Sequence, residues 1–361
     1  MKTNLYVIYG GKSAEHDVSL KTAQTVINAV DKAKYDIHPI YISPQGVWSS
    51  YGRVERQIDH YELLRIKCTG GDVATGMGGL LIRYFASEQP CVAFPVIHGT
   101  NGEDGTLQGL LELLNVPYVG SGVLASAVGM DKAAAKRLLA EAGIPQAAYM
   151  TVLRHEWAEA PDAIVARIEE ELGYPCYVKP ANLGSSIGIS RCADRPGLRD
   201  AVHAAFAYDR KLVVEREVLG RELQVAVLGN EHPVCSVAGE FEKEPEFFDY
   251  ERKYMSGNLV QRIPAQGTDR VHEQLRDYAL KAFQVLDGAG LMRVDFFVTD
   301  RDEVFLNEVN TMPGFTKISM FPALWERTDG TTYPQLIERL IGLALERHQH
   351  KQSIRYGREA I

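Results

Sequence analysis

The sequence predicts a protein of mixed α/β and α+β class, with an open α/β sheet in its first third. Residues 5–9 and 91–97 are short apolar runs, and each is followed by a glycine-rich turn and then by a helical pattern. From residue 223 the pattern changes to alternating strands. Because ligands of open α/β sheets bind at the carboxyl ends of the strands, we expect both glycine-rich turns to border a binding site.

The N-terminal third is expected to hold strands at 5–9, 37–42 and 91–97, and helices from about 18 to 30 and from 107 to 114. Residues 43–87 mix glycine, tyrosine, charged and polar side chains without a clear period. We therefore interpret this segment as a surface insertion.

A second α/β unit follows. Its predicted helices are at 132–142, 161–172 and 197–207, and its strands are at 176–180, 189–192 and 212–216. Between two of these strands lies a glycine/serine loop, residues 182–188.

The last third is predicted to contain strands at 223–228 and 234–241 and a helix at 270–286. The stretch 243–258 is polar and aromatic without clean periodicity. Long ordered loops in compact domains are often active-site lids, so we expect this segment to be one.

Size and composition exclude several classes of protein. With 361 residues the chain should form two or three domains, and 45% hydrophobic and 24% charged residues are ordinary for a globular protein. The net charge of −8 gives no basic footprint for nucleic acid and does not favour an anionic membrane surface. The five cysteines are scattered and form no CxxC pair. Because no signal peptide or membrane-spanning segment is recognisable, a cytoplasmic enzyme or binding protein is expected.

Charged residues in a predicted β-hairpin indicate a metal site. Arg293 and Asp295 share one face of the first strand, and Glu308 and Asn310 share one face of the second. If the two faces match, two carboxylates and an amide oxygen meet beside an arginine. Magnesium prefers such oxygen ligands together with phosphates. The alternative is a hairpin with solvated charges, but these charges lie within strongly apolar runs.

The phosphate-binding element is expected in the glycine/serine loop. Gly11-Lys12-Ser13 ends like a P-loop, but Tyr6 stands where the first glycine is required, and no dinucleotide fingerprint follows the first strand. The loop 184–188 comes just after Lys179, which ends an apolar strand, and its backbone N–H groups and serines could hold phosphate oxygens. A simple turn is the alternative.

Eight motifs taken together give a sharper indication. They are residues 10–19 (GGKSAEHDVS), 98–105 (HGTNGEDG), 129–132 (GMDK), 178–180 (VKP), 184–188 (GSSIG), 248–254 (FDYERKY), 293–295 (RVD) and 307–314 (NEVNTMPG). In this order they resemble the D-alanine–D-alanine ligase family of the ATP-grasp superfamily, over residues 4 to about 345. The resemblance implies a three-domain ATP-grasp architecture with boundaries at 1–127, 128–220 and 221–361. It also implies that ATP phosphorylates one D-alanine, whose acyl phosphate a second D-alanine attacks.

The resemblance implies roles on the nucleotide side. Asp295, Glu308 and Asn310 match the ligands of two Mg²⁺ ions, for which Mn²⁺ can substitute. The residues that match ATP contacts are Lys132, Lys179 and Lys253 at the phosphates, Glu215 at the adenine amino group, Glu222 at the ribose, and Phe247 and Phe297 beside the adenine. Each lysine could otherwise be a surface charge, and both phenylalanines could be core residues.

On the substrate side, Glu15 matches the residue that binds the ammonium of the first D-alanine, although a glutamate at a helix start is also expected to stabilise that helix. The other matching residues are Ser185 and Tyr254 as partners of Glu15, His98 beside the first substrate, Arg293 and the Gly314 N–H as oxyanion donors, and Ser319 and Met320 at the second carboxylate. His98 could instead be structural, and Ser319 a helix cap.

Three alternatives remain at this level. A relative could join D-alanine to D-lactate or to D-serine. The ester-forming relatives lack the Lys-Tyr pair that stands here as Lys253-Tyr254, so the resemblance favours D-alanine over D-lactate as the second substrate. Another ATP-grasp carboxylate–amine ligase should lack the pairing of Glu15 with Tyr254. A nucleotide-binding regulator would have little need for Arg293 beside a metal. The resemblance further implies a homodimer.

Overall fold

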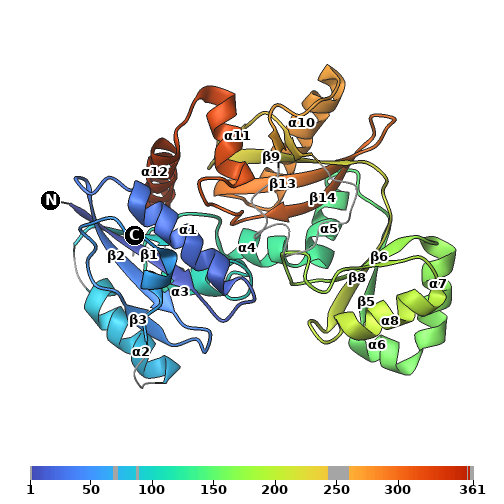
Figure 1. The fold of residues 1–361 in the computed structure, drawn as a ribbon, viewed down its shortest axis with the longest axis horizontal. Helices are drawn as coiled ribbons and strands as arrows, with labels where there is room; N and C mark the ends of the chain where they lie inside the picture. Colours follow the sequence, from blue (N-terminus) through green and yellow to red (C-terminus); the bar gives the residue numbers. More distant parts are fainter. Residues whose placement is uncertain (1, 68–71, 87–88, 243–259, 356, 358–361) are drawn as a thin grey trace.

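The computed structural model describes residues 2–67, 72–86, 89–242, 260–355 and 357, and these residues form three β-sheets (Figure 1). The sheets follow one another along the chain, with the first at one end of the molecule and the second at the other. Within the part of the chain that is described, no helix is both long and apolar enough to cross a bilayer.

The first sheet confirms the predicted open α/β fold. Its strand order is β3-β2-β1-β4. Strand β1 (Thr3–Gly10) pairs in parallel with β2 (Tyr35–Ile42) and β4 (Cys91–Pro95), and β3 (Trp48–Ser50) is antiparallel to β2. Helices α1 (His16–Ala29) and α3 (Thr106–Leu113) start just beyond the strand ends, at the two glycine-rich turns. Both turns therefore lie at the carboxyl edge of the sheet.

The segment 43–87, predicted as a surface insertion, lies mostly at the surface but is more regular than expected and contributes side chains to the core. In its described residues, this segment forms β3, the 3₁₀ turn η1 (Tyr61–Leu64), α2 (Val73–Leu80) and η2 (Leu81–Phe85). Its apolar side chains Trp48, Leu64, Leu80 and Tyr84 are buried in the cores around the first sheet. They are spaced irregularly among polar residues, so no helical or strand period reveals them.

The second sheet is antiparallel, in the order β5-β8-β6-β7. Its strands are β5 (Tyr149–Leu153), β6 (Cys176–Pro180), β7 (Ser190–Cys192) and β8 (Lys211–Arg216). Its helices are α6 (Arg154–Glu159), α7 (Pro161–Glu171) and α8 (Arg195–Ala205). These helices cover the outer face of the sheet, while α4 (Val123–Met130) and α5 (Lys132–Glu141) lie near the third sheet (Figure 1). Strand β5 was not predicted.

The third sheet carries the predicted hairpin. Its order is β12-β11-β9-β13-β14, and β10 also pairs with β9. The strands are β9 (Arg221–Gly229), β10 (Val234–Cys235), β11 (Gly239–Phe241), β12 (Gln261–Arg262), β13 (Gly290–Val298) and β14 (Val304–Asn310). Helix α10 (Asp269–Val285) packs on the sheet, and the strand predicted at 234–241 is divided between β10 and β11.

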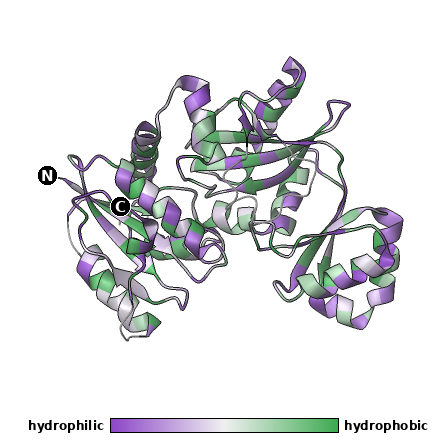
Figure 2. Ribbon diagram, viewed as in Figure 1, coloured by the Kyte–Doolittle hydropathy of each residue, from purple (hydrophilic) through white to green (hydrophobic). Residues whose placement is uncertain are grey.

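The end of the described chain returns to the beginning. After α11 (Met320–Asp329), helix α12 (Tyr333–Gln352) packs beside the first sheet (Figure 1). Leu336, Leu340 and Ile341 of α12 share one core with Leu5 and Phe94 of the first sheet. The sheet strands are mostly hydrophobic, and the outer turns of the helices are largely hydrophilic (Figure 2).

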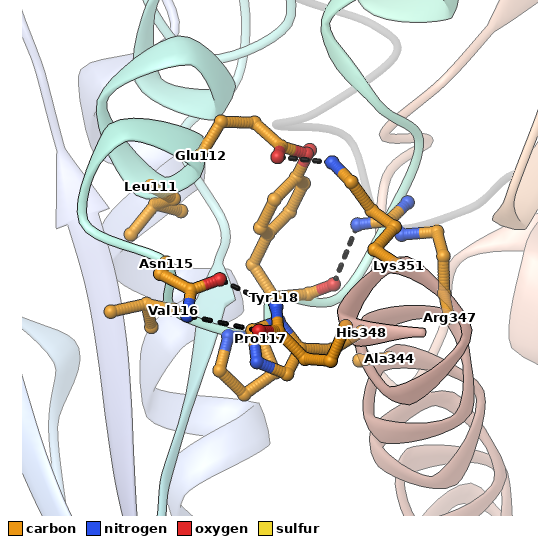
Figure 3. A pocket seen from close by; sticks show the side chains of 11 residues that line it. Leu111, Glu112, Asn115, Val116, Pro117, Tyr118, Ala344, Arg347, His348 and Lys351 are labelled. Carbon is orange, nitrogen blue, oxygen red and sulfur yellow. Dashed lines mark hydrogen bonds and ion pairs between the residues drawn. The ribbon is translucent and has the colours of Figure 1, made fainter. Parts of the chain in front are cut away.

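A polar pocket of about 410 Å³ marks the outer edge of this contact (Figure 3). Lys351 of α12 forms an ion pair with Glu112 of α3. Arg347 donates to the carbonyl of Tyr118 at 3.1 Å and stacks 4.3 Å above the ring of that tyrosine. The Lys351–Glu112 ion pair and the contacts of Arg347 with Tyr118 therefore connect α12 to α3 and to the segment that follows α3.

Candidate active site

The hairpin register brings the predicted metal ligands together. Asp295 of β13 pairs with Glu308 of β14, and Arg293 pairs with Asn310. A register shift between Asp295 and Phe296 bends the hairpin just beyond these pairs. The predicted convergence of two carboxylates, one amide and one arginine is therefore confirmed.

Arg293 and Asp295 form a close bidentate pair. The Nε and Nη2 atoms of Arg293 each lie 2.7 Å from one carboxylate oxygen of Asp295. The Nδ2 atom of Asn310 is 3.3 Å from Oδ2 of Asp295. Asp295 is buried, so this arginine compensates a carboxylate that is largely removed from water.

The same group of residues fits a divalent cation. Asp295, Glu308 and Asn310 offer hard oxygen donors, which Mg²⁺ prefers. No cluster of three His, Cys, Asp or Glu side chains suited to a metal occurs in the residues that the structure describes. The remaining ligands of an ion here would therefore come from phosphate and water, as is usual for Mg²⁺.

Two lysines connect the hairpin to the second sheet. At the start of α5, Lys132 Nζ donates to the Leu183 carbonyl at 2.8 Å and lies 3.5 Å from Glu308 Oε2. Lys179 on β6 donates to Glu215 Oε2 at 2.8 Å and to Asn307 Oδ1 at 3.2 Å. The glycine loop, the hairpin and β8 thus meet at two cations.

The glycine loop reaches across to the first sheet. Ser185 and Ser186 have φ angles of 54° and 59°, in the left-handed region that non-glycine residues rarely adopt. In this conformation the Ser185 hydroxyl donates to Glu15. A Cβ atom at Gly184 would lie 3.2 Å from Glu15 Oε2. The loop is therefore pressed directly against the Glu15 carboxylate.

Glu15 occupies the position before α1 but does not cap it. Its side chain makes no hydrogen bond to the first turn of that helix and is instead buried against Ser185. Burial and the neighbouring Glu103 carboxylate raise the pKa of Glu15, and His98, Ser185 and Lys132 act in the opposite direction. The simpler interpretation as a helix-stabilising residue therefore does not explain its position.

His98 lies beside this carboxylate and is itself buried. Its Nδ1 is 3.4 Å from Glu103 Oε1, and its Nε2 is 3.1 Å from the Thr22 hydroxyl. Burial alone would lower the pKa of His98, but Glu103 and Glu15 raise it. Both ring nitrogens thus have protein partners, which fix the orientation of the ring at the edge of the first sheet.

Glu215 lies between two lysines on the other side of the site. Lys179 contacts its Oε2, and Lys136 lies 3.2 Å from its Oε1. Burial acts to raise the pKa of Glu215, but the two lysines outweigh it and lower the pKa to about 2. Lys136 was not among the predicted site residues. Its spacing of four residues from Lys132 on one helix was the available signal, because such residues lie on the same face.

The loop after the hairpin brings Gly314 and Ser319 together. A Cβ atom at Gly314 would lie 3.4 Å from Ser319 Oγ. Although Ser319 precedes α11, its side chain makes no cap hydrogen bond and accepts from the Thr316 N–H at 3.0 Å. The alternative of a plain capping serine is therefore wrong. Met320 begins α11 and is buried.

The remaining predicted residues divide into two groups. Glu222 and Phe297 are register partners on β9 and β13, and Phe297 is half-buried on the face that carries Asp295. Phe247, Lys253 and Tyr254, together with the lid predicted at 243–258, lie outside the described residues.

Family models match both parts of the chain. Residues 4–121 match the family described as D-ala D-ala ligase N-terminus, and residues 138–342 match D-ala D-ala ligase C-terminus.

Individual relatives match nearly the whole chain. The chain is 51% identical to a D-alanine–D-alanine ligase of Geobacillus thermodenitrificans, with 99% of each protein covered, and 48% identical to one of Listeria monocytogenes, with 99% of this chain and 100% of the relative covered. Among solved structures, the D-alanine–D-alanine ligase of Coxiella burnetii is 34% identical with a TM-score of 0.78, covering 97% of this chain and 96% of its own. The VanG D-Ala:D-Ser ligase of Enterococcus faecalis is 32% identical with a TM-score of 0.78, covering 95% of this chain and 100% of its own. The chain therefore belongs to the D-alanine–D-alanine ligase family.

Proposed function

We infer that this protein is an ATP-dependent ligase that joins two D-alanine molecules into D-alanyl-D-alanine, a precursor of peptidoglycan. The near-full-length identity of about half to D-alanine–D-alanine ligases supports this activity. One structural observation carries the chemistry. Glu15, the glycine loop and the hairpin with the predicted metal ligands belong to the parts of the chain built around three separate sheets, and they border one site.

At the nucleotide end, the side chains provide charges that complement a triphosphate. Lys132 and Lys179 lie where the glycine loop and the hairpin meet, so they can neutralise phosphate oxygens. Two Mg²⁺ ions held by Asp295, Glu308 and Asn310, with Mn²⁺ as a substitute, would supply further charge neutralisation when bound. Phosphoryl transfer depends mainly on such positioning and electrostatics.

At the substrate end, Glu15 binds the ammonium of the first D-alanine. The Ser185 hydroxyl orients the Glu15 carboxylate, and His98 lies beside that carboxylate. With its amino group held there, the substrate can direct a carboxylate oxygen at the terminal phosphorus of ATP. The new P–O bond makes the substrate an acyl phosphate, and ADP leaves with the electron pair of the P–O bond that breaks.

The second half of the reaction forms the peptide bond. The amine of the second D-alanine attacks the acyl carbon, and negative charge develops on the former carbonyl oxygen. Arg293 and the Gly314 N–H are the donors that stabilise this oxyanion, while Ser319 and the Met320 backbone hold the second carboxylate. Phosphate then leaves, and the amine loses a proton.

One observation keeps a second candidate in view. The VanG D-Ala:D-Ser ligase matches over 95% of this chain, so D-serine, and by extension D-lactate, are the alternative second substrates. The pair Lys253-Tyr254, which the ester-forming relatives lack, favours D-alanine over D-lactate.

A product assay tests the assignment. Purified protein is incubated with ATP, Mg²⁺ and D-alanine alone, or with D-alanine together with D-serine or D-lactate, and the products are separated by mass. D-Alanyl-D-alanine and ADP are expected to dominate at neutral pH, and chelation of Mg²⁺ should abolish the reaction. Phosphate release only when D-lactate is present would contradict the assignment of the second substrate.

The three sheets also support a three-part organisation, for which we propose boundaries at 127 and 220, and the family resemblance supports a cytoplasmic homodimer. Sedimentation velocity at micromolar concentration tests the homodimer: a single species at twice the chain mass is expected.

A further inference from the structure

Lys136 is a buried cation with one anionic contact. Its side chain is 3% exposed, and its Nζ lies 3.2 Å from Glu215 Oε1. It also lies 5.2 Å from the centre of the Tyr149 ring. Among the described residues, Nζ of Lys136 has no well-aligned hydrogen-bond partner. Burial lowers the pKa of Lys136, and the ion pair with Glu215 is the main interaction that opposes this effect and favours the ammonium form.

Glu215 is held from two sides. Lys136 approaches Oε1 from α5, and Lys179 donates to Oε2 from β6 at 2.8 Å. Each oxygen keeps a second acceptor position, since a carboxylate has about four lone-pair sites. Glu215 is itself 3% exposed, so its protonation state depends on these two lysines and not on solvent.

The other groups that surround Glu215 add little positive charge. Tyr149 on β5 and Tyr177 on β6 are its register partners. The carboxylates of Glu308 on β14 and Glu222 on β9 act on Lys179, and Glu308 also acts on Lys136. Burial acts to raise the pKa of Glu215, and the charges and hydrogen bonds of the two lysines outweigh it and lower the pKa to about 2.

We propose that Lys136 is a specificity-determining residue of the nucleotide pocket, which keeps Glu215 a pure hydrogen-bond acceptor so that the pocket takes a 6-amino purine and rejects a 6-oxo purine. This inference rests on the proposed position of Glu215 beside the adenine amino group. An ionised carboxylate can only accept hydrogen bonds, whereas a protonated one can also donate. The 6-amino group donates to the ionised form, but a 6-oxo group faces it with a second acceptor.

Inosine triphosphate is the matched probe, because it differs from ATP at the 6 position of the purine ring and its adjacent nitrogen. The variants are Lys136→Met, which removes the charge at similar length, and Lys136→Arg, which keeps it. Arg137→Met is the control, because Arg137 is the exposed neighbour on the same helix. Steady-state kcat and KM are measured for both nucleotides with saturating D-alanine and Mg²⁺.

The wild-type enzyme is expected to prefer ATP by about a hundredfold or more in kcat/KM, because the wrong purine leaves two acceptors facing each other. Lys136→Met should narrow this preference by roughly tenfold, about the effect of 1.4 kcal/mol. The change should come from a higher KM for ATP and a lower KM for inosine triphosphate, with kcat for ATP largely kept. Lys136→Arg and Arg137→Met should stay within about twofold of the wild type.

A pH profile separates this role from a purely structural one. In the wild type, Glu215 stays ionised from pH 6 to 9, so the KM for ATP should be flat. In Lys136→Met the pKa of Glu215 rises, because burial is less opposed. As the pH falls, the KM for ATP should then rise while the KM for inosine triphosphate falls.

A second background keeps the proposal open to refutation. In Glu215→Gln the side chain cannot ionise, so adding Lys136→Met should change the nucleotide preference by less than about twofold. An equal narrowing in both backgrounds, or a preference unaffected by Lys136→Met in the wild-type background, overturns the proposal. If Glu215→Gln leaves ATP affinity and nucleotide preference unchanged, the adenine contact of Glu215 itself is wrong, whatever Lys136 does.

Discussion

Glu15 and Glu215 are two buried carboxylates at opposite ends of one site, and their surroundings differ. Glu15 is 9% exposed and Glu215 is 3% exposed. Burial and Glu103 raise the pKa of Glu15, whereas two lysines lower the pKa of Glu215 to about 2. The protein itself supplies the cations at the nucleotide end. At the other end, His98 and Lys132 do not fully offset the effects of burial and Glu103 on Glu15, and a substrate ammonium can supply the remaining positive charge.

The largest change in activity is expected from replacing Arg293, which lies between these two ends of the site. Arg293→Ala removes a donor to the developing oxyanion, so kcat should fall up to about a thousandfold. The KM for ATP should change by less than about threefold, because Lys132 and Lys179 remain. Phosphate release at saturating ATP measures both constants. Arg293→Lys should not restore activity, because lysine cannot make the bidentate contact with Asp295. Unchanged turnover would exclude the oxyanion role.

Replacing Glu15 tests the substrate end, where the pKa of the carboxylate is raised. Glu15→Gln removes the charge that binds the first ammonium, and kcat/KM for D-alanine should fall several hundredfold, about the cost of truncating one side of a buried charge pair. The melting temperature at pH 8 should stay constant or rise, because a folded-state pKa that is raised means the ionised form destabilises the fold. A melting temperature lowered by several degrees would show that Glu15 is instead a structural acid.

Replacing Glu215, in contrast to replacing Glu15, is expected to destabilise the fold. Glu215→Gln leaves Lys136 and Lys179 without their shared anion, and the free energy of unfolding should fall by about 3 kcal/mol, close to a hundredfold in the folding equilibrium. Urea denaturation followed by circular dichroism measures this change. Glu141→Gln, at an exposed site on α5, is the control and should lie within about 0.5 kcal/mol of the wild type. Equal stability of the two variants would contradict the assignment of Glu215 as the compensating anion.

The smallest effect is a pH dependence of the two Michaelis constants. As the pH falls toward the raised pKa of Glu15, the KM for the first D-alanine should rise severalfold, because the ionised form binds the ammonium. The KM for ATP should stay constant over the same range. The stability that ionised Glu215 contributes should be lost only as the pH falls from about 4.5 toward about 2. If the KM for D-alanine and the KM for ATP changed together with pH, the proposed difference between the surroundings of Glu15 and Glu215 would be contradicted.

The sequence alone predicted the parts of the fold and of the site that depend on a local pattern of residues. The alternation along residues 293–310 predicted a hairpin whose charged residues converge if the two faces match, and the register pairs Asp295 with Glu308. The strand-glycine-helix order likewise predicted the open first sheet. In both regions the side chains that matter are fixed by their immediate neighbours in the chain.

The sequence alone did not predict which residues are buried by contacts between distant segments of the chain. Lys136 has the appearance of a surface lysine on an amphipathic helix, and only the approach of β8 shows that it is buried beside Glu215. The apolar residues of 43–87 have no period, since each fills a separate gap around the first sheet. The docking of α12 on that sheet joins segments more than 200 residues apart, beyond the reach of any local signal.

That docking affects the order in which the protein can be built. The first sheet leaves the ribosome early, but Leu336, Leu340 and Ile341, which complete its hydrophobic core, are translated more than 200 residues after its strands. Until α12 emerges, the nascent sheet exposes apolar surface to solvent. A ribosome-stalled chain ending before Tyr333 is therefore a natural client for chaperones, and docking of α12 is the step that completes the core of the first sheet.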